Sequence, residues 1–449
     1  MRGLKSTIAL IVVLGGLGAY IYFVTWKQGD KTDTAKQDKV FVALEPDKIE
    51  EVKVKSEKGD TTTIKKENGA WQMTAPVATK ADESEVTGIT TSLGQIAVVR
   101  VIDENPSDLK EYGLATPRIE INFKASGDKD YRKLYIGEKS PTGADLFAKR
   151  NDEKKVFLIP AFQESSFNKG TFDLRDKTLW KFERDKVDSL DVTAGGKTIA
   201  MTRATGDWKI TKPVESRADF GAVEGLIGRL QSAQMKSIVA DQATPADLKK
   251  YALEKPEVTV NVSTGSAKAT LLVGGKAEDN TVYVRDLSRP AVMTVESSLV
   301  DELKKGADDY RKKDIFEFRA FNANRVEITR NGQSVAFEKT KGQGENAPDK
   351  WKRVSPTPGD VDKDKIDSLL SRLSNMRATS FVAADAKTGL DKPAMTVVAK
   401  FDDGKKEDRV TFGKNGDDAY ASRPGEPGAA KVDSADFTEV NKTLDEISK

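Results

Sequence analysis

A stretch of about 137 residues occurs three times in this chain of 449 residues, with the same signals in the same order. The signals are a tryptophan, a proline, an amphipathic helix, a Leu-Pro segment and a strand that ends in glycine. Between copies, the tryptophan and the helix keep the same separations, 137 residues and then 143. The constant separations indicate one packed module present three times. The aligned residues are Trp71, Trp208 and Trp351, followed in the helix by Val86, Val223 and Ile366.

The repeat length falls in the usual size range of a domain, roughly 100 to 150 residues, so each copy is long enough to bury its own core. The much shorter units of a solenoid must stack on one another to do so. We therefore predict three modules in tandem. The predicted organisation is a cytoplasmic stub (1–5), a transmembrane anchor (6–26), a polar linker (27–40), module 1 (41–177), module 2 (178–313) and a divergent module 3 (314–449).

Each module begins with alternating apolar and polar residues around a tight turn. The turns lie at 58–60, 195–196 and 331–332, and the last two read Gly-Gly and Asn-Gly. These pairs favour hairpins because both central residues of the preferred turn need a positive φ. The pattern predicts a three-stranded antiparallel meander at the start of every module.

A helix is predicted after each meander, because apolar residues there recur at spacings of three and four. Asp82, Asp219 and Asp362 stand where a helix N-cap is expected, since a carboxylate there accepts hydrogen bonds from free amides. We expect this helix to cover a sheet. The predicted fold class is α+β: an N-terminal transmembrane helix, then three modules, each an antiparallel sheet with one long amphipathic helix and shorter helices.

Residues 6–26 contain no charged side chain and would form a helix of roughly 31 Å, which matches the thickness of a bilayer core. Tyr22 and Trp26 are predicted as membrane-interface anchors, because amphipathic rings prefer the headgroup level. Arg2 and Lys5 precede the span and favour a cytoplasmic N-terminus. We therefore expect membrane lipid as a partner of this helix and the bulk of the chain outside the cytoplasm.

The composition removes much of the usual catalytic chemistry. The chain has no histidine and no cysteine, which excludes imidazole bases, Ser-His triads and thiolate chemistry. We predict no catalytic residue, no cofactor and no metal site. The 73 basic and 71 acidic residues nearly cancel, so net charge gives no argument for binding nucleic acid.

Several weak patterns have simpler interpretations. The Ser-x-x-Lys strings at 107–110 and 166–169 lack the companion motifs of acyl-transfer enzymes. The acid pairs at 402–403 and 417–418 lack the spacing of a calcium loop and are interpreted as turn carboxylates. A carboxylate-dependent hydrolase stays open, since it needs only two suitably placed acids.

The repeated tryptophans could form a carbohydrate-stacking platform or pack in the core. Their fixed distance to the helix favours the core, so Trp71, Trp208 and Trp351 are predicted as structural markers. A second set of related residues lies where one module meets the next and is predicted to pack at that seam. The seam residues are Arg175, Trp180, Arg311 and Phe316.

The Gly-x-Trp turns at 69–71 and 206–208, the Leu-x-x-Tyr-x-Leu-x-x-Pro segments at 109–117 and 248–256 and the Arg-x-Lys seams together resemble a bacterial family, the domain of unknown function numbered 4340. Module 3 lacks the Gly-x-Trp turn and the tyrosine. The resemblance implies a protein of the bacterial inner membrane, with most of the chain in the periplasm or outside. Genes of this family often lie beside an ABC transporter and its gliding-motility-type auxiliary protein. The family defines no catalytic residues.

These observations predict a non-catalytic, membrane-anchored extracytoplasmic binding or scaffold protein. Its expected role is that of an accessory subunit in an ABC-type transport or surface-assembly complex, with a permease or auxiliary protein as partner. The alternative is a stand-alone cell-envelope protein that binds glycans or acts as a carboxylate-dependent hydrolase. The sequence specifies neither a substrate nor an oligomeric state.

Overall fold

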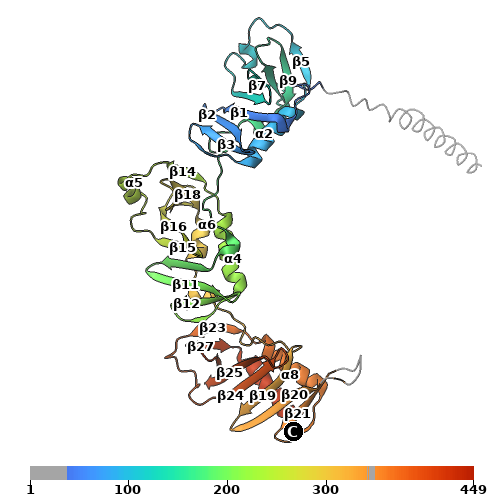
Figure 1. The fold of residues 1–449 in the computed structure, drawn as a ribbon, viewed down its shortest axis with the longest axis vertical. Helices are drawn as coiled ribbons and strands as arrows, with labels where there is room; N and C mark the ends of the chain where they lie inside the picture. The colour runs from blue at the N-terminus through green and yellow to red at the C-terminus, as the bar shows by residue number, and fades with distance from the viewer. Residues whose placement is uncertain (1–37, 341, 343–348, 449) are drawn as a thin grey trace, which may run out of the picture. The chain divides into compact units, whose positions relative to one another are not determined.

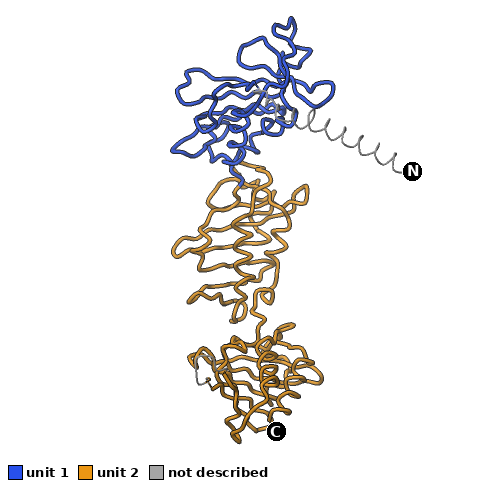
Figure 2. The backbone as a smooth tube through the Cα atoms, turned by 90° about the vertical axis from the view of Figure 1, so that its right-hand side faces the viewer, with its two compact units in different colours: residues 1–177 blue, residues 178–449 orange. Residues whose placement is uncertain are grey.

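The computed structural model describes residues 38–340, 342 and 349–448. The chain divides into two compact units, residues 1–177 and 178–449 (Figure 2). The first unit holds one β-sheet and the second holds two. The predicted anchor at 6–26, with Tyr22 and Trp26, lies outside the described residues.

All three sheets have nine antiparallel strands in the same order. In module 1 the order across the sheet is β4-β3-β2-β1-β6-β7-β8-β9-β5. The meander β1 to β4 and the meander β6 to β9 meet where β1 pairs with β6. The strands are β1 (Ile49–Lys55), β2 (Thr61–Glu67), β3 (Ala70–Ala75), β4 (Thr79–Lys80), β5 (Arg100–Asp103), β6 (Ile119–Ala125), β7 (Arg132–Lys139), β8 (Asp145–Arg150) and β9 (Val156–Pro160).

Modules 2 and 3 repeat this topology strand for strand. In module 2 the strands are β10 (Ser189–Ala194), β11 (Lys197–Ala204), β12 (Asp207–Lys212), β13 (Ser216–Arg217), β14 (Ser237–Ala240), β15 (Val258–Thr264), β16 (Ala267–Lys276), β17 (Thr281–Asp286) and β18 (Val292–Glu296). In module 3 they are β19 (Ala323–Arg330), β20 (Gln333–Thr340), β21 (Lys350–Ser355), β22 (Gly359–Asp360), β23 (Ala378–Val382), β24 (Met395–Phe401), β25 (Lys406–Asn415), β26 (Asp418–Ser422) and β27 (Ala429–Val432).

One 13-residue helix per module packs against the sheet: α2 (Glu83–Gln95), α4 (Phe220–Ser232) and α8 (Lys363–Asn375) (Figure 1). The predicted N-caps are confirmed, since the side chains of Asp82, Asp219 and Asp362 accept hydrogen bonds from backbone amides in the first turn. Such a cap stabilises a helix by about 1 kcal/mol. The predicted apolar stripes are buried; in module 1, Val86, Ile89 and Leu93 join one core with residues of both meanders.

The remaining helices are short, except for the last. Module 1 has η2 (Pro46–Lys48), η3 (Lys110–Tyr112), η4 (Ala161–Gln163) and α3 (Glu164–Phe167). Module 2 has η5 (Arg184–Lys186), α5 (Pro245–Lys250), α6 (Ser297–Leu303) and α7 (Ala307–Tyr310). Module 3 closes with α9 (Ser434–Ile447), which packs beside α8.

The glycine predicted to end a strand lies instead two residues before the end of β7, β16 and β25, where it allows a close backbone approach. A Cβ at Gly137 would lie 2.1 Å from the carbonyl oxygen of Tyr112, and one at Gly274 would lie 2.1 Å from that of Tyr251. At Gly413 the equivalent distance, to Thr388 O, is 2.3 Å. The Leu-Pro segment therefore crosses directly over this strand, which explains why the two signals recur together.

The predicted meanders are confirmed, but the predicted fold class is wrong: the modules are mostly β. Nine strands accompany one long helix in modules 1 and 2 and two in module 3, and the helices α3, α6 and α7 have only four to seven residues. The sequence prediction gave too much weight to the helical stripe, because edge strands as short as β4, β13 and β22 carry no periodic signal. Residues 100–103, just after α2, form the edge strand β5 beside β9.

The transmembrane part of that prediction is also corrected. Within the described ranges, no helix is both long and apolar enough to cross a membrane. The membrane and single-pass assignments therefore have no support in the described residues.

Candidate functional site

Each module opens with a short segment that runs past the end of its long helix. We call residues 39–44, 178–183 and 314–319 the opening segments. In each, a backbone amide donates to a carbonyl at the helix end: Val40 to Ile96 at 2.9 Å, Leu179 to Ala233 at 3.1 Å and Ile315 to Met376 at 3.0 Å. These bonds put the next residues, Phe41, Trp180 and Phe316, at equivalent positions, and all three are buried.

An arginine from the far meander ties each opening segment to its sheet. Arg150 donates to the carbonyl oxygen of Val40 at 2.7 Å, and Arg423 donates to that of Ile315 at 2.8 Å. In module 2, Arg289 donates to the carbonyl oxygen of Leu179. The sequence prediction missed these arginines, because the distance from the repeated tryptophan to the arginine differs by several residues between copies.

The three sheets differ at one register position beneath the opening segment. The pairs Phe123 with Arg132, Val262 with Ala269 and Ala399 with Asp408 occupy the same place in the three topologies. The second members are therefore equivalent: an arginine in module 1, an alanine in module 2 and an aspartate in module 3. Only module 3 places a carboxylate there.

Asp408 holds the opening segment of module 3 against the sheet. Its Oδ2 accepts hydrogen bonds from the amides of Glu317 at 2.6 Å and Phe318 at 3.0 Å, and its Oδ1 accepts one from Arg423 at 2.7 Å. Asp408 is 1% exposed, and both Phe316 and Phe318 are fully buried. Charge-assisted bonds of this kind are among the strongest in proteins.

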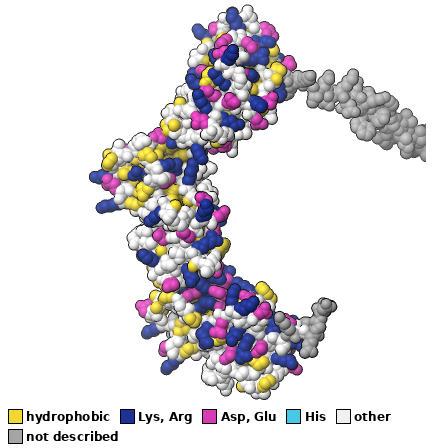
Figure 3. Space-filling view, in the orientation of Figure 1, with side chains coloured by type: hydrophobic (Ala, Val, Ile, Leu, Met, Phe, Trp, Pro, Cys, Tyr) yellow, Lys and Arg dark blue, Asp and Glu magenta, His cyan; other side chains and the backbone are white. Residues whose placement is uncertain are grey.

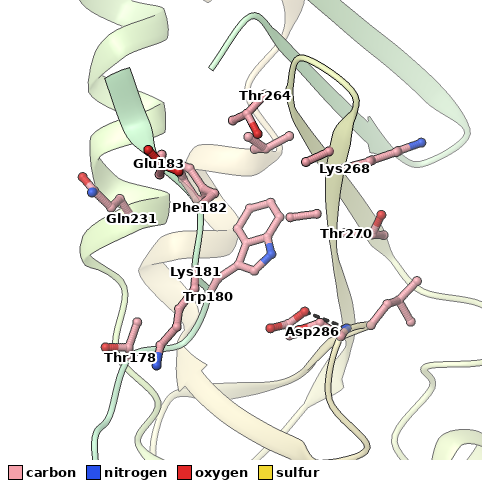
Figure 4. Close-up of a pocket in the computed structure, with 15 residues that line it drawn as sticks. Thr178, Trp180, Lys181, Phe182, Glu183, Gln231, Thr264, Lys268, Thr270 and Asp286 are labelled. Carbon is pink, nitrogen blue, oxygen red and sulfur yellow. Dashed lines mark hydrogen bonds between the residues drawn. The ribbon is translucent and has the colours of Figure 1, made fainter. Parts of the chain in front are cut away.

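Module 2 has a groove at the equivalent place. It has a volume of about 870 Å³ and lies between the opening segment, the β15–β16 hairpin and the turn after β17 (Figure 4). Since Ala269 replaces the aspartate, its side chain cannot accept hydrogen bonds from the amides of Lys181 and Phe182. Phe182 is only half-buried, unlike its counterpart Phe318.

The indole of Trp180 lies in the middle of the residues that line this groove (Figure 4). Trp180 is 1% exposed, and its ring meets that of Phe182 edge to face, with the centroids 5.0 Å apart. Its Nε1 is buried and has no hydrogen-bond partner. In Figure 4 this nitrogen points toward the strand that carries Thr270. A buried N–H without an acceptor is costly, so this atom marks a place where an acceptor is missing.

The charged side chains around the groove are compatible with an anionic ligand. The carboxylate of Asp286 accepts from the amide of Ser288 at 2.9 Å and from Arg289 at 3.3 Å. Glu183 pairs with Lys186 at 2.6 Å. Both acids near the groove are thus matched by donors or cations, and the exposed Lys268 adds a positive charge to its rim.

The other predicted seam residues also lie at module ends. Arg175 bridges to Ala81, and Arg311 bridges to Ala218. Arg311 is 9% exposed, and its guanidinium lies 3.8 Å from the ring centroid of Phe381 in β23. This arginine thus connects modules 2 and 3 within the second unit, whereas Trp180 belongs to the groove of module 2 and Phe316 to the core of module 3.

The repeated tryptophans differ in exposure. Trp71 is 5% exposed and Trp208 is 2% exposed, and the Nε1 of Trp208 donates to Glu224 at 2.9 Å. Trp351 is half-buried and lines a separate groove of about 520 Å³ with the exposed Phe321. The acid pairs at 402–403 and 417–418 lie in or beside turns, and the described residues contain no group of three or more acids arranged to hold a metal ion.

The sequence contained one signal for the groove that its interpretation missed. Trp180 aligns with Phe316, so only the middle copy carries an indole N–H at this position. From the sequence alone, Trp180 is predicted to pack at the seam, because an aromatic residue between modules usually packs. The strand pairing shows that Ala269 and Asp408 are equivalent, because they pair with Val262 and Ala399, and this pairing is visible only in the sheets.

Space-filling views place a further apolar feature on module 2. Hydrophobic side chains gather on the visible face around β14, β16 and β18 (Figure 3). In the same module, Tyr251, Leu253 and Val292 form a small buried cluster, and the partly buried Leu272 and Tyr283 pack against it. The apolar surface of this module therefore extends beyond the groove.

Comparison with protein families gives one match, the model described as Domain of unknown function (DUF4340). It matches three stretches, residues 71–209, 208–393 and 351–449, so the first two matches begin at one repeated tryptophan and reach or pass the next. No curated protein matches the chain, and no solved structure does. With matches from residue 71 to the C-terminus and the module topology present three times, the chain belongs to the DUF4340 family.

Proposed function

We propose that this chain is a non-catalytic binding or scaffold protein whose three modules each present a separate contact surface. The proposal rests on the contrast between the residues that recur in all three modules and the residues that differ from module to module. The N-cap aspartates, the opening-segment arginines and the glycines beneath the Leu-Pro segments recur in all three modules. All of these residues hold the module together.

The residues that vary share one place in the module, and in module 2 a ligand could reach that place. Arg132, Ala269 and Asp408 share a register position, yet only the alanine lines a groove. A protein with one framework and three different surfaces is suited to several contacts at once, and linked contacts add to the apparent affinity. Across residues 38–340 and 349–448, the same framework offers no repeated set of reactive side chains.

The partners proposed are components of an ABC-type transport or surface-assembly complex, as the family resemblance implies. The test is co-purification of the tagged full-length chain from its native cells after mild solubilisation. A permease and an ATPase should be enriched at a fixed ratio to the chain. Recovery of the chain alone, after cross-linking as well as before, would count against this proposal.

The alternative of glycan binding has one specific observation in its favour, the half-buried Trp351 beside the exposed Phe321. Aromatic faces of this kind can stack on sugar rings. A glycan array probed with the full-length chain tests it, with Trp351→Ala as the variant and Trp71→Phe as the control. Glycan binding that Trp351→Ala abolishes would favour this alternative.

A further inference from the structure

We propose that the groove of module 2 binds a small organic carboxylic acid, whose carboxylate takes the place that the Asp408 side chain holds in module 3. The inference rests on the proposed binding function and gives that function a ligand class. It starts from three modules with one framework, in which one module carries its own carboxylate and another carries a groove.

The first step is the equivalence of the two positions. Ala269 pairs with Val262 as Asp408 pairs with Ala399, and these strands occupy the same places in sheets of the same order. Both positions lie beneath an opening segment that an arginine ties to the sheet. A carboxylate added at Ala269 would therefore meet the same backbone that Asp408 meets.

The second step is the set of donors that a carboxylate would find. In module 3, two successive amides of the opening segment donate to Asp408. Phe182 supplies the amide equivalent to that of Phe318 in module 2. A ligand carboxylate placed like that of Asp408 could accept from it, and charge-assisted bonds of this kind bind tightly.

The third step is the unpartnered indole N–H of Trp180, an observation independent of the register. Its Nε1 is buried in the lining of the groove and lacks an acceptor. The equivalent residues, Phe41 and Phe316, have no such donor. A second ligand oxygen in the groove would satisfy this N–H, so the change from phenylalanine to tryptophan adds a donor only where a groove exists.

The volume and lining indicate the rest of the ligand. A groove of about 870 Å³ is far larger than one carboxylate needs, and Val262, Ala267 and Leu287 give it apolar walls. Pockets of this size hold molecules with an apolar body and a few polar anchors. The exposed Lys268 at the rim favours a negative rather than a neutral ligand.

The probe is benzoate, and benzamide serves as its uncharged counterpart. The full-length chain labelled with 5-fluorotryptophan is titrated and followed by fluorine NMR, with the Trp180 signal assigned from Trp180→Phe. Benzoate should shift the Trp180 signal saturably, and benzamide should bind at least about tenfold more weakly, as expected for the loss of one charge-assisted bond. An unmoved Trp180 signal, or equal affinity for the two probes, overturns the proposal.

The decisive variant is Ala269→Asp, which gives module 2 the carboxylate of module 3. It should raise the Tm of module 2 and abolish benzoate binding. Ser298→Asp, at an exposed position of α6, is the matched control with the same charge change and should leave benzoate binding intact. If Ala269→Asp binds benzoate as well as the wild type does, or if it lowers the Tm of module 2, the proposed carboxylate site beside Ala269 is wrong.

The two proposals can fail separately. If benzoate does not bind while the permease and ATPase still co-purify, only the carboxylate site is wrong. If benzoate binds and is converted to another compound, the non-catalytic function is wrong and the site stands. Loss of both benzoate binding and co-purification overturns both.

Discussion

Arg423 donates a hydrogen bond at 2.7 Å to the carboxylate of Asp408, and the same guanidinium donates to the carbonyl oxygen of Ile315 at 2.8 Å. One arginine therefore connects a side chain in the middle of the sheet with the segment that enters the module. Because Asp408 is almost completely buried, removing Arg423 would leave this carboxylate without the arginine that neutralises it, whereas Arg423 also lies 3.8 Å from Glu317 and from Glu426.

Replacing Asp408 should destabilise module 3. Asp408→Ala removes the acceptor of two backbone amides and the carboxylate nearest to Arg423, and breaking a buried charge pair of this kind costs about 3 kcal/mol. Unfolding in urea can be followed through the fluorine signal of Trp351 in the labelled chain. The control Asp417→Asn changes an exposed acid and should have little effect. A loss below about 1 kcal/mol, the value of an ordinary neutral hydrogen bond, would contradict this role.

The cavity left by Asp408→Ala should accept a small anion. We expect formate to recover part of the lost stability of this variant and to leave the wild-type module unchanged, because only the variant lacks a carboxylate at this position. The measurement is the Trp351 unfolding midpoint with and without formate, with equal sodium chloride as the salt control. Equal stabilisation of variant and wild type would show a general salt effect.

The contact beneath the Leu-Pro segment predicts a sharp difference between two adjacent glycines. A Cβ at Gly274 would lie 2.1 Å from the carbonyl oxygen of Tyr251, whereas the atom nearest to a Cβ at Gly275 would be 3.7 Å away. Gly274→Ala must therefore displace backbone and should cost about 3 kcal/mol, while Gly275→Ala should be nearly neutral. Urea unfolding of module 2, read from Trp208, compares them. Similar stabilities of the two variants would refute the close contact.

The repeat itself, the meanders and the capped helices could be predicted from the sequence because each has a local signal. Asp219 precedes an apolar stripe, and Gly195 and Gly196 mark a turn. The sheet that joins the two meanders could not be predicted, since the pairing of β1 with β6 connects residues about 70 positions apart and follows from no local spacing.

The candidate site was hidden for a related reason. Trp180 could be aligned with Phe316, but its free N–H follows from the absence of an acceptor, which depends on residues from several strands. Ala269 is an inconspicuous residue in a sequence. Its role can be recognised only when the sheets are compared. Ala269 pairs with Val262, and the residue at the equivalent position of module 3 is Asp408.

The arginine of module 1 should be needed to hold its opening segment. Arg150 donates to the carbonyl oxygen of Val40 at 2.7 Å and pairs with Glu153 at 2.8 Å. Arg150→Met removes both bonds and should cost about 1 to 2 kcal/mol, most of it from the bond to the carbonyl. Arg100→Met alters an exposed arginine in the edge strand and is the control. Hydrogen exchange at the amide of Val40 should become faster in Arg150→Met and stay unchanged in Arg100→Met. If exchange at Val40 is unchanged in Arg150→Met as well, Arg150 does not hold the opening segment.

A cluster of charges in module 1 predicts how its stability depends on pH. Arg118 pairs with Glu164 at 2.5 Å, and Lys139 pairs with the same carboxylate at 2.8 Å. Burial by itself raises the pKa of Glu164, but hydrogen bonds from Lys139 and Arg118 outweigh it, so the pKa lies below its ordinary value. A carboxyl with a lowered folded-state pKa stabilises fully above its unfolded pKa, and that stabilisation is lost as the pH falls through the folded pKa.

Glu164→Gln should therefore destabilise module 1 by about 1 kcal/mol at pH 7, and by progressively less as the pH falls below about 4.5. Unfolding in urea at a series of pH values, read from the fluorine signal of Trp71, measures the difference between variant and wild type. Glu111→Gln removes an exposed carboxylate from η3 and should show no such trend. If Glu164→Gln costs the same at pH 3 as at pH 7, the two cations do not stabilise the ionised carboxylate, and the cluster contributes through packing instead.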